Sequence, residues 1–294
     1  MKRGSPSPVP LLDPAHQTMA SREAAAAFDA IAEDFDGRFS EWASVAAQRR
    51  AVRRWLTRTF PSDGTLLELG AGTGEDAMYM AAQGFRIVAT DPSPRMVNAA
   101  RQKSAAQGMS ERILSEQADA AQLTEHGARW HASGLAPFDG AYSNFAALNC
   151  VEDLTPVAQS LAGMLRTNAA VALVLFGPLP PGEIAVQLAR GKPGTAFRRV
   201  RHAVTARLGG REFSVRYHRP REVARAFAPW FRLERRVGIG VFVPPSAAEP
   251  AVSRHPRLLR ALEGLDTICE RPLALLGDHV LYLFRRIDHS PLGS

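Results

Sequence analysis

Three glycines and two carboxylates are the residues of this 294-residue chain whose types and spacing point most clearly to chemistry. Gly70, Gly72 and Gly74 follow an apolar run that is typical of a buried parallel strand. Glycine at these positions lets the chain turn sharply and lets the backbone approach a ligand closely. Glu68 lies within that strand, and Asp91 follows a second apolar run, where a carboxylate can accept hydrogen bonds from both hydroxyls of a ribose. The pattern predicts a nucleotide-binding turn.

The spacing of the glycines separates two classes of nucleotide-binding turn. A pyrophosphate-binding turn has the pattern G-x-G-x-x-G, whereas this chain has G-x-G-x-G. A nicotinamide-dependent dehydrogenase is therefore disfavoured. The order of strand, glycine turn, helix, strand and acid resembles motif I and the following acidic motif of class I S-adenosylmethionine (SAM) dependent methyltransferases. Within that family it is most similar to the small-molecule branch typified by the menaquinone and ubiquinone (quinone-biosynthesis) methyltransferases.

This resemblance implies a fold, a cofactor and a reaction. Motifs carry it over residues 28–176, and the C-terminal strands support it only by their order. It implies an α/β, doubly wound, Rossmann-like fold with a seven-stranded methyltransferase sheet. It also implies SAM as the cofactor and methyl transfer to a small metabolite, which could be anionic.

The resemblance further implies which residues hold the cofactor. Ala118-Asp119-Ala120 is similar to the family's adenine motif, in which a carboxylate accepts a hydrogen bond from the exocyclic amine. Met96 lies one turn inside a helix, where the family often places an apolar contact near the adenosine. The complete set expected to bind the cofactor is Phe35, Glu68, Gly70, Ala71, Gly72, Gly74, Asp91, Pro92, Met96, Ala118, Asp119, Ala120, Asn144 and Phe145.

Alternating strands and helices must position these residues. Apolar runs and helical periods predict strands at 66–69, 85–90, 113–118, 138–145 and 169–176, and helices at 46–60, 76–83, 91–105 and after 153–156. Such alternation indicates a doubly wound sheet. Further along, the closing antiparallel pair of the family's sheet is matched by expected strands at 231–243 and 279–284, on either side of a mostly helical segment at 257–276.

The N-terminal part of the chain is expected to change character at residue 21. Residues 1–20 are rich in proline and serine without a hydrophobic period, which predicts disorder. Residues 21–294 are expected to form the methyltransferase domain, with Ser21 capping a helix that carries Phe28 and Phe35 at helical spacing. Two interpretations explain that spacing, namely a lid over the cofactor and a core-facing amphipathic helix.

An inserted basic segment follows the fifth strand at residues 177–228. Between residues 181 and 225 it holds 11 arginine and lysine residues against three acidic ones, whereas the whole chain has a net charge of +7. The segment is expected to be a lid or substrate-binding insertion, because arginine pairs with planar oxyanions. A solvated helix face explains the charge equally well. The expected substrate-binding residues are Asn149, Arg198, Arg199 and Tyr217.

No motif fixes a catalytic residue. Methyl transfer needs alignment of the acceptor and exclusion of water, and it needs a base only when the acceptor must lose a proton. Asn149, His202 and His218 are weak candidates, and structural or surface roles explain each of them as well. The end of the fourth strand lacks the Asn/Asp-Pro-Pro-aromatic tetrad of adenine- or glutamine-directed enzymes, and Cys150 lacks the context of a cytosine-methylating cysteine.

The composition and two alternative functions limit the kinds of partner that the chain is expected to have. One alternative is an RNA methyltransferase that lays the basic insertion on phosphates, and the other is an inactive SAM-binding protein. A small-molecule acceptor is preferred to nucleic acid, because few aromatic residues interleave the arginines and no RNA-binding module is recognisable. Two cysteines, no apolar stretch of 18 residues and no metal-ligand cluster predict a cytoplasmic protein without a membrane span or a metal. Both a monomer and a homodimer fit the sequence.

Overall fold

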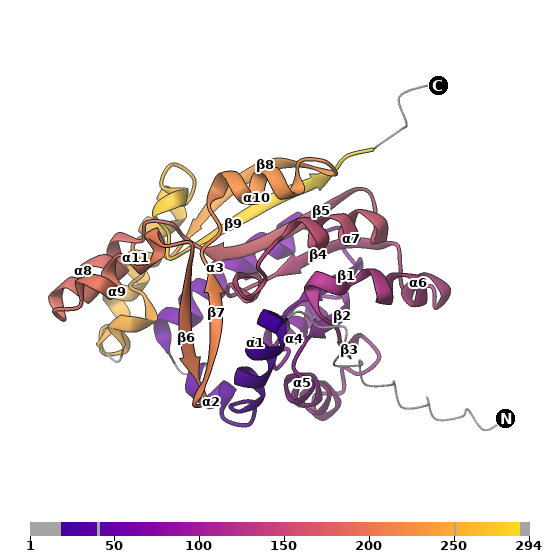
Figure 1. Cartoon of the computed structure of the whole chain (residues 1–294), viewed down its shortest axis with the longest axis horizontal. Coiled ribbons are helices and arrows are strands. Elements are labelled where there is room, and N and C mark those ends of the chain that lie inside the picture. Colours follow the sequence, from indigo (N-terminus) through magenta and orange to yellow (C-terminus); the bar gives the residue numbers. More distant parts are fainter. Residues whose placement is uncertain (1–18, 40–41, 250, 289–294) are drawn as a thin grey trace.

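Seven strands form the central sheet, in the order β3-β2-β1-β4-β5-β9-β8 (Figure 1). The computed structural model describes residues 19–39, 42–249 and 251–288. The first five strands pair in parallel, and β9 runs antiparallel to both of its neighbours. The arrangement confirms the expected doubly wound, seven-stranded fold. The strands of this sheet are β1 Thr65–Leu69, β2 Arg86–Asp91, β3 Ile113–Gln117, β4 Phe138–Ser143, β5 Leu165–Phe176, β8 Phe231–Ile239 and β9 His279–Arg286.

The strand order reverses between β1 and β4, and this reversal positions the functional site. From β1 the chain builds β2 and β3 on one side, and it then crosses to β4 and β5 on the other side. Leu69 is paired with Thr90 of β2, and Glu68 is paired with Tyr142 of β4. The carboxyl ends of the three strands therefore meet at one edge. Open α/β sheets bind ligands at such a switch point.

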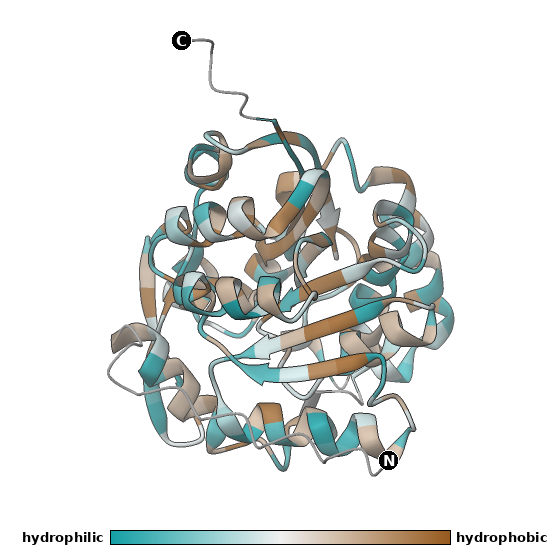
Figure 2. Ribbon diagram, turned by 90° about the vertical axis from the view of Figure 1, so that its right-hand side faces the viewer, coloured by the Kyte–Doolittle hydropathy of each residue, from teal (hydrophilic) through white to brown (hydrophobic). Residues whose placement is uncertain are grey.

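Helices cover both faces of the sheet, whose strands carry hydrophobic residues along much of their length (Figure 2). Helices α3 and α4 pack on one face around Leu56 and Met80, and α6, α7 and α10 pack on the other around Trp130 and Phe227. No helix among the described residues has the length and apolar character needed to cross a membrane. The helices are α1 Met19–Asp29, α2 Phe35–Phe39, α3 Ala43–Thr59, α4 Glu75–Ala82, α5 Pro94–Ala106, α6 Thr124–Ala132, α7 Thr155–Met164, α8 Pro181–Ala189, α9 Pro193–Ala196, α10 Pro220–Phe227 and α11 Pro256–Cys269.

The basic insertion folds into helices and a hairpin that stands apart from the sheet. Strands β6 (Ala203–Leu208) and β7 (Arg211–Arg216) form this hairpin, which reaches α1 in Figure 1. Phe213 and Val215 of β7 pack against Ala24 and Ala27 of α1. The insertion and the N-terminal helix are thus one layer, held together by apolar contacts between segments that lie far apart in the sequence.

The N-terminal helix differs from the expectation in both of its boundaries. It begins at Met19, so Ser21 is a buried residue within α1 rather than its cap, and residues 19 and 20 are helical. The disorder expected for residues 1–18 lies outside the described residues. The helix ends at Asp29, and Phe35 begins a separate short helix. The aromatic residues therefore meet through a turn and not along one continuous helix.

One expectation in the rest of the chain is also wrong in extent. The expected strand at 231–243 ends at Ile239, because Gly240 adopts φ +67° and leaves the strand geometry. The segment 257–276 is mostly helical as expected, with α11 ending at Cys269 and a short 3-10 helix at Ala274–Leu276. Helix α6 was not expected, since Gly127 and two histidines weaken its sequence signal, yet it buries Trp130 in the core.

The backbone just after β5 closely approaches the backbone just before β9, and this approach gives a test of the packing. A Cβ atom on Gly177, just after β5, would lie 1.9 Å from the carbonyl oxygen of Gly277. We expect Gly177→Ala to lower the free energy of unfolding by about 1–3 kcal/mol, because the start of β9 must move. Gly163→Ala in α7 is the matched control, since its Cβ would meet nothing within 4 Å. Equal stability of the two variants in urea unfolding would contradict this packing.

Candidate functional site

The glycine turn leaves the end of β1 with left-handed backbone at each glycine. The φ angles are +69° at Gly70, +55° at Gly72 and +81° at Gly74. A Cβ on Gly70 would lie 2.3 Å from the Cβ of Ala147, whereas a Cβ on Gly72 would enter open space. The first glycine thus permits close packing of the chain, and the second keeps the space above the turn free for a ligand.

Asp91, at the end of β2, joins the glycine turn to the next βα turn. Its Oδ2 accepts a hydrogen bond from the Gly72 N–H at 2.8 Å, and its Oδ1 accepts one from the Ser93 N–H at 2.9 Å. Burial raises the pKa of Asp91 to about 6, against the two backbone hydrogen bonds, which act to lower it. The carboxylate is therefore preorganised by the backbone and titrates near neutral pH.

A cavity lies over these turns, and we call it the cofactor cavity. Asp119 also lines it, and the two carboxylate oxygens of this residue differ in environment. Oδ1 accepts a hydrogen bond from the Ala121 N–H at 3.0 Å, while Oδ2 is buried and has no hydrogen-bond partner among the described residues. Ten of the expected cofactor residues line the cavity, namely Phe35, Gly70, Gly72, Asp91, Pro92, Met96, Asp119, Ala120, Asn144 and Phe145.

Four expected cofactor residues do not line the cavity. Ala71 and Gly74 close the turn, because the Ala71 N–H donates to Thr90 and the Gly74 N–H donates to Ala71. Ala118 is buried beside Asp119. Glu68 is fully buried below the turn, where burial, reinforced by the charge of Asp76, raises the pKa of its carboxyl well above the ordinary value. These residues support the cavity from behind.

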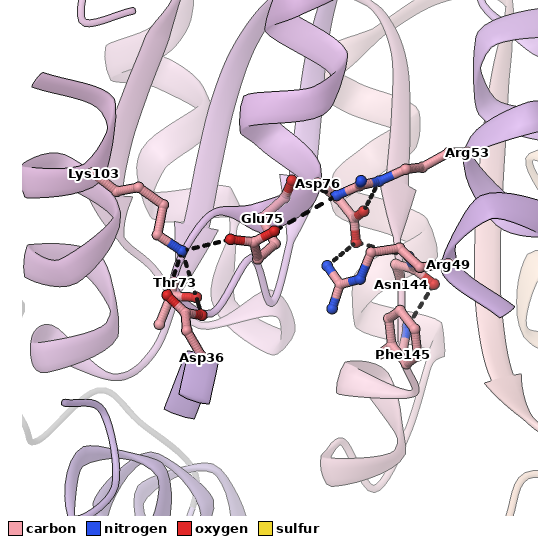
Figure 3. Close-up of polar contacts among 9 residues, drawn as sticks. All are labelled: Asp36, Arg49, Arg53, Thr73, Glu75, Asp76, Lys103, Asn144 and Phe145. Carbon is pink, nitrogen blue, oxygen red and sulfur yellow. Dashed lines mark hydrogen bonds and ion pairs between the residues drawn. The ribbon is translucent and has the colours of Figure 1, made fainter. Parts of the chain in front are cut away.

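Helices α1 and α2 cover the cofactor cavity, and polar contacts hold them there. Asp29, at the end of α1, accepts hydrogen bonds from the Ser93 hydroxyl and from the Arg95 N–H. Asp36 of α2 accepts a hydrogen bond from Thr73 at 2.6 Å and forms an ion pair with Lys103 at 2.5 Å (Figure 3). The N-terminal segment is therefore fastened to the glycine turn and to α5, as the lid interpretation requires.

Asp76, in the first turn of α4, is the centre of a second polar cluster (Figure 3). Arg53 contacts its carboxylate at 2.7 Å and Arg49 at 3.2 Å, and the Asn144 amide donates to it at 2.8 Å. The oxygen of the same Asn144 amide accepts a hydrogen bond from the Phe145 N–H at 2.7 Å. The cluster joins α3, the glycine turn and the segment after β4, and it thereby fixes the position of Phe145.

The segment after β4 adopts an unusual backbone. Phe145 and Ala146 have φ angles of +48° and +60°, a region in which residues with a Cβ are strained. The Ala146 N–H donates to the Val174 carbonyl of β5, and the Arg49 guanidinium lies 4.6 Å from the centre of the Phe145 ring. This strain places the aromatic ring between the cofactor cavity and a second cavity, and the ring lines both.

We call the second cavity, of about 350 Å³, the acceptor cavity. Three aromatic residues, Phe28, Phe35 and Phe145, line it as well as the cofactor cavity, so the two spaces meet there. The rest of its wall combines apolar side chains, including Trp42 and Phe176, with polar ones. The polar side chains are Gln48, Arg49, Glu183, Arg198, Arg199, Ser246, Asp278 and His279.

His279, the first residue of β9, has a defined tautomer among these polar side chains. Gln48 donates from Nε2 to Asp278 at 3.2 Å, and its Oε1 lies 3.1 Å from Nδ1 of His279. Because a carboxylate only accepts hydrogen bonds, the amide nitrogen must face Asp278 and its oxygen must receive the Nδ1 proton. The Nε2 atom of neutral His279 then carries a lone pair, and it makes no hydrogen bond within the described part of the chain.

The charge states around His279 follow from burial and from its neighbours. Burial lowers the pKa of His279, and Arg199 adds to this effect while Asp278 opposes it. Burial alone would raise the pKa of Asp278, but His279, Arg199 and the hydrogen bonds from Arg199 and Gln48 hold it below its ordinary value. The arrangement is therefore a neutral imidazole beside an ionised carboxylate, which is suited to accepting a proton.

Arg198 and Arg199 lie at the acceptor cavity as expected, but acidic partners neutralise them. Glu183 is buried between them, contacting Arg198 at 2.5 Å and forming a second ion pair with Arg199. Arg199 also contacts the Asp278 carboxylate at 2.6 Å and stacks over the Phe176 ring. The expectation that their charge is available to an anion is therefore not supported, because each guanidinium already has a carboxylate.

The other expected substrate and catalytic residues lie outside both cavities. Asn149 is buried, and its amide donates to the Arg216 carbonyl and accepts from the Phe176 N–H, so it ties β7 to β5. Tyr217 is buried against Phe176. His218 is buried with Nε2 close to two carbonyl oxygens, and His202 is exposed on the surface. Their side chains serve the hairpin rather than a reaction.

Sequence reasoning missed part of the polar lining of the acceptor cavity. Gln48, Asp278 and His279 had no motif around them, and Gln48 and His279 are 231 residues apart in the sequence. An available signal was the polar pair Asp278-His279 at the start of the last apolar run of the chain. Ala24 and Ala25 of α1 also line the cofactor cavity without having been expected to do so.

Comparison with known proteins identifies the domain. Residues 66–168 match the family model described as a methyltransferase domain. This part of the chain is therefore similar to a methyltransferase domain. Its match in curated proteins includes the tRNA 5-carboxymethoxyuridine methyltransferase of Escherichia coli K12, at 27% identity over 155 residues, 51% of this chain and 56% of that protein. The chain spans about half the length of the curated relatives it matches.

Solved structures share the fold of this chain. The CcbJ methyltransferase from Streptomyces caelestis is 15% identical with a TM-score of 0.57, over 89% of this chain and 98% of that one. Geranyl diphosphate C-methyltransferase from Streptomyces coelicolor A3(2), solved with S-adenosyl-L-homocysteine, is 16% identical with a TM-score of 0.50, over 81% and 79%. At these identities the likeness concerns the fold alone.

SAM is the cofactor of this domain class, and the cofactor cavity fits it. The unpaired Oδ2 of Asp119 can accept a hydrogen bond from the adenine amine, and Asp91 can accept hydrogen bonds from the ribose hydroxyls. The open space above Gly72 leaves room beside both carboxylates. The residues present thus match the hydrogen-bond donors of the cofactor.

The pKa of Asp91 gives a test of its role in the methyltransferase domain. Because burial raises this pKa to about 6, the carboxylate takes up a proton as the pH falls below that value, and it then loses its capacity to accept both hydroxyls. We expect the Kd for SAM to rise below pH 6, by up to about tenfold per pH unit. Isothermal titration of the protein with SAM between pH 5 and pH 8 measures this.

Asp91→Asn is the matching variant, and Asp63→Asn, in an exposed turn before β1, is its control. We expect Asp91→Asn to weaken SAM binding by more than about tenfold at pH 7.5 and to remove the dependence on pH. The control should behave as the wild type. Unchanged affinity in Asp91→Asn would sink the assignment of this carboxylate to the ribose.

Proposed function

We propose that the chain is a SAM-dependent methyltransferase that methylates a small-molecule acceptor in the acceptor cavity. The observation that carries the proposal is the meeting of the two cavities at Phe145. One cavity has the turn and carboxylates that fit SAM, and the other has aromatic side chains and a neutral histidine in its wall. An acceptor in the second cavity can reach the cofactor where the two cavities meet, beside aromatic side chains that exclude water.

The walls of the acceptor cavity support a particular kind of acceptor. Phe28, Phe145 and Phe176 offer flat apolar surfaces, and His279 offers an acceptor of a proton. These features suit a molecule with an aromatic or apolar body and an ionisable hydroxyl group. The small-molecule branch that includes the quinone-biosynthesis methyltransferases, favoured by the sequence motifs, acts on acceptors of this kind, and we propose that the chain belongs to it.

In the proposed reaction the residues of this chain align the acceptor and remove its proton. When bound, SAM supplies a methyl group on a sulfonium leaving group, so no further activation of the methyl group is needed. The acceptor hydroxyl lies against Nε2 of His279, which takes the proton as the oxygen gains the methyl group. Gln48 holds the proton on Nδ1, and Asp278 stabilises the imidazolium that forms.

One relative favours a second candidate function, methylation of RNA. The tRNA 5-carboxymethoxyuridine methyltransferase of Escherichia coli covers 51% of this chain at 27% identity. In an RNA methyltransferase the acceptor cavity would hold a base turned out of its stack. The paired charges of Arg198 and Arg199 weigh against phosphate contacts at the rim of this cavity.

Transfer of labelled methyl from SAM distinguishes these functions. The purified protein is incubated with labelled SAM and an extract of the host, which is then separated into small-molecule, RNA and protein fractions. We expect the label in the small-molecule fraction, because the arginines at the acceptor cavity are paired with carboxylates and are not available to RNA phosphates. Label in RNA would establish the second candidate, and no transfer with normal SAM binding would indicate an inactive SAM-binding protein.

His279→Gln tests the proposed base with the acceptor fraction found in this way. We expect kcat to fall by about 10²- to 10⁴-fold with little change in SAM affinity. The wild-type rate should fall as the pH drops through the lowered pKa of His279, because the protonated imidazole cannot accept a proton. The variant should lose this limb of the pH–rate profile.

The control for this variant is His126→Gln. His126 is also buried with a lowered pKa, but it lies on α6 and outside both cavities. Its substitution should leave the pH–rate profile unchanged. If His279→Gln keeps the wild-type pH–rate profile, or if both variants alter it alike, His279 is not the base.

A further inference from the structure

A second hollow adjoins the acceptor cavity, and Arg199 lines both. The hollow is open and has a volume of about 730 Å³. It lies between the start of α10, strand β8 and the segment that leaves β5. We call it the arginine groove, after the four arginines that line it in addition to Arg199, namely Arg219, Arg221, Arg225 and Arg236.

The four arginines have no acidic partners. None of them forms an ion pair within the described residues, in contrast to Arg198 and Arg199. Glu222 is the acidic residue among those that line the groove, and its carboxylate accepts a hydrogen bond from the Arg219 N–H and lies 3.8 Å from His202. Four like charges around one hollow repel one another, and an anion between them would remove that repulsion.

Two further observations point to an anion. Arg219 and Arg221 lie at the N-terminal end of α10, where the helix dipole disfavours cations and favours a negative charge. Arg236, from β8, has a buried Nε atom without a hydrogen-bond partner in the described residues. A buried N–H group left unpaired is unfavourable, and an oxyanion in the groove would pair it.

The apolar residues of the groove narrow the class of ligand. Leu179, Val200 and Leu275 line it with exposed fractions of 51%, 60% and 39%, which are high for large aliphatic side chains. Exposed apolar side chains beside a charged site indicate a ligand with an apolar chain next to its anionic group. The lining holds no aromatic residue on which a nucleotide base could stack, so single-stranded RNA fits less well.

From these contacts we infer that the arginine groove is a binding site for the phosphoryl group of an organic phosphate with an apolar chain. The inference rests on the proposed function in one respect, since the shared residue Arg199 makes this phosphate part of the methyl acceptor. The charge of the acceptor is then bound by arginines of the insertion and of β8, outside the cavity in which the methyl group is transferred.

Binding of octyl phosphate to the full chain tests this inference. The probe is used below its critical micelle concentration and measured by isothermal titration at fixed ionic strength. We expect saturable binding to the wild type and a loss of at least about tenfold in Arg221→Gln/Arg225→Gln. The matched control, Arg207→Gln/Arg211→Gln, removes two exposed arginines of the hairpin and should bind within about twofold of the wild type.

Three outcomes would overturn the inference. Equal losses in the two double variants would mean that only the net charge of the protein matters. Binding of a ten-residue uridine oligonucleotide, without binding of octyl phosphate, would make the groove an RNA contact. Binding of vesicles of phosphatidylcholine and phosphatidylserine, again without binding of octyl phosphate, would make it a membrane contact.

SAM titration of the same samples separates this inference from the proposed function. We expect wild-type SAM affinity in both double variants, because none of the four substituted residues lines the cofactor cavity. Failure of octyl phosphate to bind, with SAM binding and methyl transfer intact, defeats the groove alone. Binding of octyl phosphate without any methyl transfer defeats the proposed function alone.

Discussion

The hydrogen bond from the Gly72 N–H to the Asp91 carboxylate is the contact on which the site depends. It joins the turns that follow two adjacent parallel strands, so the floor of the cofactor cavity is set by the sheet itself. Left-handed backbone at Gly70 brings the chain against Ala147, beyond β4, on the other side of the switch point. A small error in either turn would displace Asp91 from the ribose that we propose it binds.

Ion pairs and hydrogen bonds to charged groups hold the helices and loops that surround the cofactor cavity. Lys103 holds α2 beside the glycine turn through an ion pair and a hydrogen bond. Asp76 forms an ion pair with α3 and accepts a hydrogen bond from the segment after β4. The same principle divides the arginines of the insertion into two groups. Arg198 and Arg199 are paired and line the acceptor cavity, whereas the arginines at the start of α10 form no ion pair with the carboxylates that the structure describes and are available to an external anion.

The sequence predicts the parts of this site that depend on local structure. The sheet, the glycine turn, Asp91 and Asp119 follow from motifs in which the functional residues lie next to the elements that position them. Gln48 and His279 could not be found in this way, because only the packing of α3 against the start of β9 brings them together. Asn149 was misjudged for a related reason, since a buried amide looks the same in sequence whether it binds a substrate or two backbone groups.

A crystal structure of the chain with S-adenosylhomocysteine would test most directly whether the two cavities work as cofactor and acceptor sites. We predict that the ribose hydroxyls lie on Asp91, that the adenine amine lies on Asp119, and that the sulfur faces the Phe145 ring. The space beside that ring, where the two cavities meet in front of His279, should stay free for the acceptor. Density for the purine in the acceptor cavity, or a sulfur atom turned away from Phe145, would contradict the assignment of the two cavities.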